Sequence, residues 1–302
     1  MNTVDMIYDL SSIWAAVNEE FPYFDRLDFN WNDHYRNYLG KVLQATSEKE
    51  FHTLLTEFLA KLNDGHTKYI PPAQYRESKP LVRPDKPSYG FKDGVLTIKI
   101  NEFLSDYSGY VKGILEGADG ISLVRLDIRD NIGGNTAYAA RVAELFISGV
   151  FHACQKWAQI RNAVDAASCS IIAGYSEERL QKYINDGLMT RDAIVDALKV
   201  VNRTNYEEYV DSFGSEDNIA IYDGPLEILI SRRTMSAAED FASMFRSSHR
   251  AELVGEPTFG STGTPYHIPL RCGGRAQVVS VGYRLLDGTE FIGQGIAPDR
   301  EA

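Results

Sequence analysis

A serine lies where a buried strand is expected to turn into a helix, within the stretch Ile228 to Phe245. Ser236 stands at this junction, where free backbone N–H groups and the positive end of the helix dipole favour negative charge. An oxyanion that forms there would be stabilised. Ser236 also suits the N-cap position, and Glu239 completes the S-x-x-E pattern of a capping box. Taken alone, this stretch favours a helix cap over a nucleophile, and the rest of the chain must decide between the two roles.

A turn with two adjacent glycines, Gly133 and Gly134, follows a second predicted strand at Ser122 to Ile128. A helix is expected after the turn, from Tyr138 to Phe146, so the segment has the order of an α/β unit. Adjacent glycines let a ligand approach backbone N–H groups with no Cβ in the way. The spacing of the glycines fits neither a P-loop nor a dinucleotide-binding motif, so the sequence gives only weak support for a phosphate-binding site.

One of the six histidines, His66, lies on a predicted loop. It belongs to the segment Asn63 to Thr67, in which Asn, Asp and Gly favour a turn after a helix. A lone histidine is usually a surface or structural residue, and this applies to the other histidines as well. The position of His66 alone therefore assigns no chemistry to it.

The composition is that of a soluble globular protein and argues against several kinds of partner. Over 302 residues the formal net charge is −11 and no basic cluster compensates for it, so we expect no nucleic-acid or membrane partner. The cysteines Cys154, Cys169 and Cys272 lack the paired spacing of a zinc site and fit a reducing compartment. No basic and apolar leader and no membrane-spanning run is found. We therefore expect a cytoplasmic protein, unless a leader has been removed.

The hydrophobic pattern divides the chain into a helical N-terminal part and an α/β core. Residues 1–70 are expected to form a small helical bundle, because apolar residues recur at helical spacing. A proline-rich linker follows at 71–88. The α/β core then covers 89–302, with a helical insertion at about 150–222 that packs on the core or forms a lid.

Particular elements can be placed within these parts. Ser47 and Glu50 make a capping box at the start of the third helix of the bundle. In the core, strands are expected where apolar and polar residues alternate or where short apolar runs occur. The expected strands are Leu96 to Ile100, Ser122 to Ile128, Leu226 to Ile230 and Ala251 to Val254, and the expected helices of the insertion are Glu177 to Ile184 and Arg191 to Val201.

Four separated motifs occur in one order: LNDGHT at 62–67, LDIRDNIGG at 126–134, TMSAAED at 234–240, and VGEPTFG at 254–260 with GIAPD at 295–299. Each is modest alone, but the ordered set is specific. Together they resemble the C-terminal processing (tail-specific) peptidase family of serine hydrolases, which includes the tricorn protease core and the interphotoreceptor retinoid-binding proteins. The resemblance covers about 62–147 and 223–299, and the helical N-terminus is similar to the family's leading subdomain. Residues 150–222 match nothing that we recognise.

The resemblance implies a Clp-protease/crotonase-like α/β core with Ser236 as nucleophile. It also implies an oxyanion hole made by the Gly133–Gly134 turn and the backbone N–H of Ala237. This agrees with the physical argument, because a serine at a helix start and a glycine turn at a strand end supply the donors that acyl transfer needs. No metal or nucleotide cofactor is implied, and the substrate would be a peptide or an unfolded protein.

The base differs from that of the better-known branch of the family. Members of the Ser/Lys type carry a lysine directly after the T-F-G element, whereas here Gly260 is followed by Ser261, and no lysine occurs after Lys199. The tricorn-like branch uses a histidine from the segment that matches LNDGHT. The resemblance therefore implies His66 as the base that takes the Ser236 proton and returns it to the leaving amine.

The group that orients His66 is left open among three carboxylates. The tricorn pattern has a serine before the histidine and a distant glutamate, whereas Gly65 stands at the first position here. Glu290 is close to the family glutamate and displaced by about two positions, so its side chain would keep the same strand face. Asp64 and Glu239 are the competing candidates.

The family's peptide-binding PDZ module is missing from its usual place, which here holds only Ile70 to Ser88. Recognition of a substrate's C-terminus would then fall to the core, the bundle or the insertion. Three arginines could contact a carboxylate, although structural ion pairs are the commoner role of such side chains. They are Arg129, Arg232 and Arg233.

The leading hypothesis is a serine endopeptidase or oligopeptidase that uses Ser236 and His66. The alternative is a noncatalytic binding protein that keeps the same cleft for a hydrophobic ligand or peptide, as the retinoid-binding relatives imply. A crotonase-type acyl-CoA enzyme is a third hypothesis, and it leaves the TMSAAED serine without a role.

Overall fold

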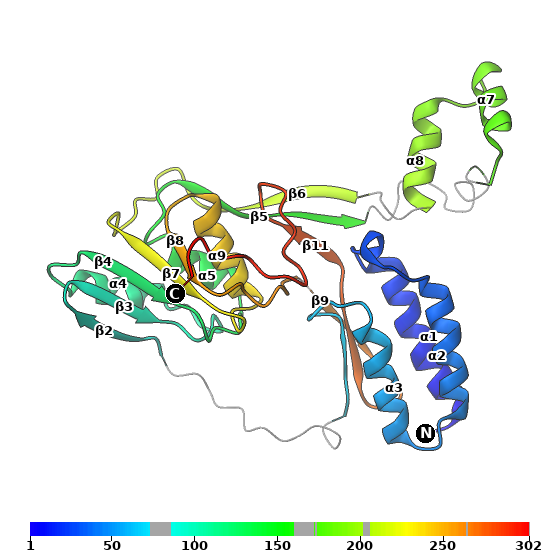
Figure 1. Ribbon diagram of the computed structural model, residues 1–302, viewed down its shortest axis with the longest axis horizontal. Coiled ribbons are helices and arrows are strands. Elements are labelled where there is room, and N and C mark those ends of the chain that lie inside the picture. The colour runs from blue at the N-terminus through cyan, green and yellow to red at the C-terminus, as the bar shows by residue number, and fades with distance from the viewer. Residues whose placement is uncertain (73–85, 160–171, 173, 202–205, 264, 302) are drawn as a thin grey trace.

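The computed structural model describes residues 1–72, 86–159, 172, 174–201, 206–263 and 265–301. Most of the linker predicted at 71–88 lies outside these ranges, as does Cys169. Figure 1 shows a helical bundle beside an α/β core, with two small sheets between them.

Three helices at the N-terminus form the bundle (Figure 1). Each begins after an Asn or Ser whose side chain accepts a backbone N–H of the first turn, which satisfies a donor that a helix start leaves free. Ser47 caps the third helix, as its sequence predicts. Inner positions such as Leu10, Val42 and Phe51 are fully buried. The helices are α1 (Thr3–Glu20), α2 (Trp31–Gln44) and α3 (Glu48–Ala60), and a short 3₁₀ helix, η1 (Phe24–Arg26), follows α1.

A five-stranded sheet forms the centre of the core and contains, side by side, β2 (Ser88–Lys92), β3 (Val95–Lys99), β4 (Leu123–Asp127), β7 (Leu226–Ile230) and β8 (Glu252–Gly255). The last four strands are parallel and match the predicted strands, while β2 is antiparallel to β3. Parallel neighbours need crossover connections, and these contain α4 (Ser108–Glu116), α5 (Thr136–Ala143) and α9 (Ala237–Ser247). Because β4 and β7 are parallel neighbours, the turns that follow them lie at the same edge of the sheet.

Two three-stranded sheets lie between the bundle and the core. One contains β1 (Lys68–Ile70), β10 (Arg275–Val279) and β9 (Pro265–Pro269), and the other contains β11 (Val281–Arg284), β5 (Val150–Gln159) and β6 (Tyr206–Gly214). β10 contacts α1, and β5 contacts α9. Since β10 leads directly into β11, one segment of chain runs through both sheets, and β1 with the loop before it is fixed to this segment.

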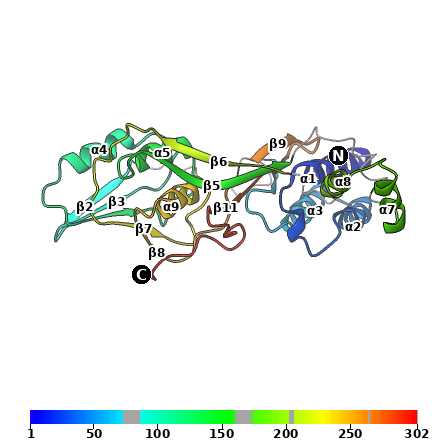
Figure 2. The same ribbon diagram turned by 90° about the horizontal axis from the view of Figure 1, so that it is seen from above.

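The insertion differs from the helical one predicted, because it contains two long strands besides its helices. β5 and β6 pair as a long antiparallel ribbon. α7 (Glu177–Asn185) and α8 (Arg191–Val201) match the predicted helices and lie at the end of this ribbon, on the bundle side of the molecule (Figures 1 and 2). The strands were not predicted because polar residues take inner positions: Lys156 is only 8% exposed and pairs with Asp211.

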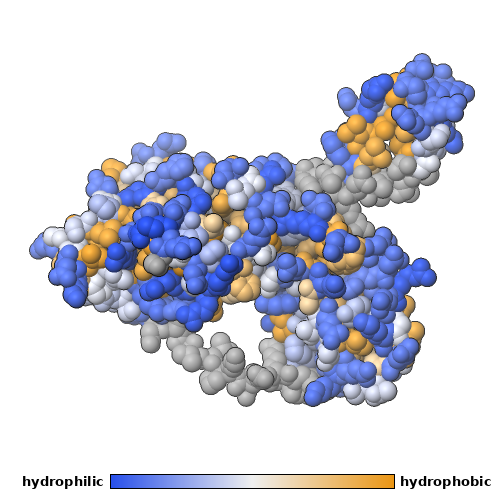
Figure 3. Space-filling model, in the orientation of Figure 1, coloured by the Kyte–Doolittle hydropathy of each residue, from blue (hydrophilic) through white to orange (hydrophobic). Residues whose placement is uncertain are grey.

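The surface is mainly hydrophilic on the face that Figure 3 shows. Apolar side chains gather on one side of the α7–α8 pair (Figure 3). The exposed large apolar residues of this part of the chain include Leu188, Val195 and Leu198. Among the described helices, none combines the length and the apolar character of a membrane span.

Candidate active site

Ser236 lies on the sharp turn between β7 and α9, at the N-cap of the helix. Its backbone has φ 59° and ψ −132°, a conformation that is rare for a residue with a side chain and marks strain. Two backbone hydrogen bonds hold the turn: Ser236 N–H donates to the Ser261 carbonyl at 2.9 Å, and Met235 N–H to the Asn131 carbonyl at 3.1 Å. The side chain of Ser236 stays partly exposed. The strained turn therefore presents the hydroxyl at the edge of the sheet.

His66 comes from a remote loop and contacts this serine. Its Nε2 lies 3.2 Å from Ser236 Oγ, although 170 residues separate the two. The Asp64 carboxylate fixes the loop, because it accepts the backbone N–H of His66 at 3.1 Å and the hydroxyl of Thr67 at 2.6 Å. From β10, Gln277 donates its side-chain amide to the His66 carbonyl at 2.7 Å. Asp64 and Gln277 therefore hold the backbone of His66 and leave its ring to other partners.

The surroundings of His66 keep its ring neutral. Burial, together with the positive charge of Lys68, lowers the pKa of His66 from 6.5 to about 4. A ring with this pKa is uncharged at neutral pH and can accept a proton from a neighbouring hydroxyl.

The second ring nitrogen of His66 contacts a hydroxyl and not a carboxylate. His66 Nδ1 is hydrogen-bonded to Ser261 Oγ. Glu290, the expected partner, forms an ion pair with Arg26 at 2.9 Å, and its side chain is 47% exposed. The expectation assumed a strand through Glu290, whereas β11 ends before it and the following residues form turns, so the alternation of strand faces does not apply.

Glu239 is fully buried in the first turn of α9 and binds the loop that carries Ser261. Its Oε1 accepts the Thr258 hydroxyl at 2.5 Å and the Gly260 N–H at 2.7 Å. Its Oε2 accepts the N–H of Ser261 at 2.8 Å and that of Ser236 at 3.3 Å, and the latter belongs to the capping box. Burial raises the pKa of Glu239 to about 7, while these hydrogen bonds oppose the rise. Glu239 thus ties the nucleophile turn to the loop of Ser261.

The glycine turn packs directly against the nucleophile. A Cβ on Gly133, at φ +96°, would lie 2.5 Å from Ser236 Cβ and 3.0 Å from the backbone nitrogen of Ala237, so only glycine fits. The N–H of Gly133 donates to Asn131 Oδ1 at 2.9 Å and is therefore not free, in contrast to the prediction. Within the described part of the chain, the N–H groups of Gly134 and Ala237 donate to no protein group. These two are the backbone donors open to an oxyanion.

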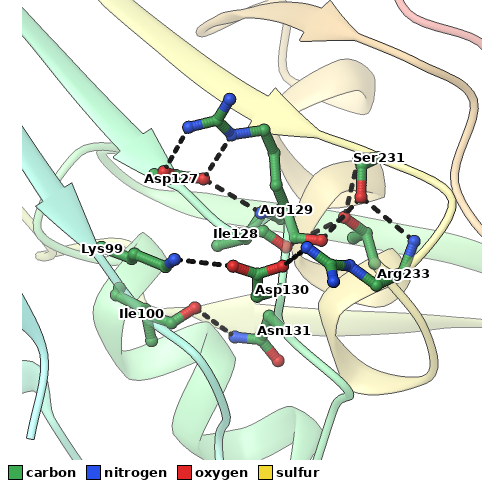
Figure 4. A network of polar contacts seen from close by, with 10 residues as sticks. Lys99, Ile100, Asp127, Ile128, Arg129, Asp130, Asn131, Ser231 and Arg233 are labelled. Atoms are coloured by element: carbon green, nitrogen blue, oxygen red, sulfur yellow. Dashed lines mark hydrogen bonds and ion pairs between the residues drawn. The ribbon is translucent and has the colours of Figure 1, made fainter.

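The three arginines that could contact a substrate carboxylate have protein partners. Figure 4 shows the network around the ends of β4 and β7, in which Arg233 pairs with Asp130. Arg129 makes two hydrogen bonds to Asp127, at 2.9 and 2.8 Å. Arg232 donates to a backbone carbonyl at 3.1 Å. These contacts agree with a structural role for each arginine.

The described residues contain no cluster of three or more His, Cys, Asp or Glu side chains that could hold a metal ion. Asp240, beside Glu239, is buried as well, but its carboxylate accepts the hydroxyls of Thr136 and Thr262 at 2.6 and 2.9 Å. The acidic residues of α9 are thus bound to protein groups.

Ser261 is the site residue that the sequence did not assign. Its place directly after the T-F-G element was the available signal, because in the Ser/Lys branch this position holds the base. That signal identifies a position beside the nucleophile, but it does not tell which atom a serine would contact there.

Comparisons with known proteins now place these motifs in a family. The model of peptidase family S41 matches residues 94–302, and that of the tricorn protease C1 domain matches residues 7–60. A protein assigned as a peptidase from Parabacteroides merdae has 18% identity and a TM-score of 0.72, over 100% of this chain and 90% of that one. Mature CPAF has 10% identity and a TM-score of 0.70, over 99% and 92% of the two chains. The photosystem II D1 C-terminal processing protease has 14% identity and a TM-score of 0.58, over 98% and 93%.

At these identities the solved structures support the fold alone, and they agree with the predicted α/β core. The family match, which covers more than half of the chain, confirms the resemblance to the C-terminal processing peptidases. The chain belongs to peptidase family S41 and is a serine peptidase.

Proposed function

We propose that this peptidase uses Ser236 as nucleophile and His66 as base. The observation that carries the proposal is the 3.2 Å contact between His66 Nε2 and Ser236 Oγ, which is within reach for proton transfer. A Ser/Lys pair would need a lysine after Gly260, where Ser261 stands.

The geometry supports acyl transfer to the serine. Ser236 Oγ attacks the carbonyl carbon of a peptide bond while His66 Nε2 takes its proton. The N–H groups of Gly134 and Ala237 and the positive end of α9 stabilise the oxyanion. The protonated His66 gives its proton to the leaving amine, and water, activated by the same ring, then releases the acid. The substrates would be oligopeptides or unfolded segments of proteins.

Labelling with a fluorophosphonate, followed by mass spectrometry of the peptides, tests the nucleophile. Wild type is expected to take one label on Ser236, and Ser236→Ala none. Ser248→Ala, which removes a serine at the other end of the same helix, is the matched control and is expected to label like wild type. A peptide library then tests cleavage. A folded wild type that takes no label and cuts no peptide would contradict the proposal and favour the noncatalytic binding protein.

The labelling rate is expected to rise with pH through a midpoint near 4 and to be level from about pH 6 upward. His66 must be neutral to act as base, and burial and Lys68 lower its pKa to about 4. Protonation removes the base, so the rate is lost as the pH falls through this value. The rate is measured across this range, with circular dichroism at each pH as a control for folding. A midpoint near 6.5, the ordinary histidine value, would contradict a buried base.

A further inference from the structure

The ring of His66 is held between two serines. Its Nε2 lies 3.2 Å from Ser236 Oγ, and its Nδ1 is hydrogen-bonded to Ser261 Oγ. We propose that Ser261 is a positioning residue whose hydroxyl orients the His66 ring, in the place that a carboxylate takes in the Ser-His-Asp triad. This proposal rests on the proposed Ser236–His66 pair. Ser261 is 1% exposed, so solvent does not compete for this contact.

A hydroxyl suits both protonation states of the base. To take the Ser236 proton, Nε2 of the neutral ring must be free of hydrogen, so the hydrogen is on Nδ1 and is donated to Ser261 Oγ. After the transfer both ring nitrogens carry hydrogen, and the Nδ1–H keeps the same acceptor. Ser261 thus holds the orientation of the ring during the reaction and adds no negative charge.

The backbone of Ser261 is fixed to the helix that presents the nucleophile. Its N–H donates to Glu239 Oε2 at 2.8 Å, and its carbonyl accepts the N–H of Ser236 at 2.9 Å. Glu239 lies in the first turn of α9 and Ser236 caps it. The nucleophile and the group that orients its base are therefore parts of one hydrogen-bonded unit, which favours a constant distance between them.

Gly65 leaves the space that the Ser261 side chain fills. A Cβ at position 65 would lie 2.7 Å from Ser261 Oγ and 2.9 Å from its Cβ. It would also lie 2.7 Å from the ring of Phe259, which is 44% exposed and can move aside. A side chain at 65 and the hydroxymethyl group of Ser261 thus compete for one place beside His66. The glycine at 65 and the serine at 261 form a matched pair.

Replacement of Ser261 by alanine is expected to lower kcat and the labelling rate about 10- to 100-fold with little change in KM, because the Nδ1–H loses its partner and the ring its orientation. Thr262→Val is the matched control, since this neighbouring hydroxyl is buried but binds Asp240. Thr262→Val and Glu290→Gln are expected to keep the wild-type kcat. An unchanged kcat in Ser261→Ala, or an equal loss in Thr262→Val, would overturn the proposal.

A pair of double variants separates orientation from packing. In Gly65→Ser/Ser261→Gly, the side chain at position 65 puts a hydroxyl into the space that the Ser261 side chain leaves empty. In Gly65→Ala/Ser261→Gly, a methyl group fills the same space without an oxygen. The first is expected to label at least about tenfold faster than the second, because only the oxygen can accept the Nδ1–H. Equal rates in two folded double variants would overturn the role of Ser261. The absence of label on wild-type Ser236 would instead overturn the proposed function.

Discussion

Replacement of His66 by alanine is expected to lower kcat/KM and the labelling rate of Ser236 on the order of 10⁴- to 10⁶-fold, the range found when a serine protease loses its base. The variant removes His66 Nε2, which lies 3.2 Å from Ser236 Oγ and is the side-chain proton acceptor that the described residues place beside this hydroxyl. The backbone of residue 66 keeps its bonds to Asp64 and Gln277. The free energy of unfolding should therefore fall by only about 1 kcal/mol.

The rate loss is measured with peptide substrate and with the fluorophosphonate, and urea unfolding measures the stability. His152→Ala is the matched control, since this histidine lies on β5, where its ring contacts Ser212 at 3.0 Å. It is expected to keep the wild-type rate. A His66→Ala variant within about tenfold of wild type would show that another group, or water, serves as base.

The arrangement of the core could be predicted because each element carries its own pattern. In β7, Leu226, Ile228 and Ile230 are buried and alternate with less buried residues. The helix caps also depend only on residues close in sequence, since Ser47 accepts a backbone N–H from a residue three positions later. Such features depend on neighbours in sequence, and the sequence displays them directly.

The site depends on contacts between segments that are distant in sequence, and such contacts are harder to predict from the sequence. A serine at a helix start can be predicted, but its contact with His66, 170 positions away in the sequence, depends on the folding of the chain between them. Only the order of the family motifs indicated that pair. Which side chain contacts His66 Nδ1 depends on how the loop at 256–263 packs against α9. Glu239 fixes this packing through its hydrogen bonds to the loop. No local sequence pattern shows which side chain of the loop lies beside the His66 ring, so the sequence did not predict the role of Ser261.

Glu239→Ala is expected to lower the free energy of unfolding by about 3–5 kcal/mol, a larger loss of stability than His66→Ala should cause. The carboxylate accepts four hydrogen bonds, and two of its donors, Gly260 N–H and Ser261 N–H, are buried backbone groups. A buried donor left without a partner costs about 1–3 kcal/mol. The loop would also release Ser261, so the labelling rate should fall with the stability. Urea unfolding measures the first effect and fluorophosphonate labelling the second.

Asp240→Asn provides the matched comparison to Glu239→Gln, because both carboxylates are buried on the same helix. Asp240 accepts two hydroxyls, which can rotate to become acceptors for an amide N–H. The backbone N–H groups that face Glu239 cannot become acceptors. In the Gln variant the side-chain NH₂ group would therefore face at least one backbone N–H, a donor against a donor. Glu239→Gln should therefore be the more destabilising of the two in urea unfolding. If Asp240→Asn were the more destabilising, rigid backbone donors would not explain why a carboxylate lies at position 239.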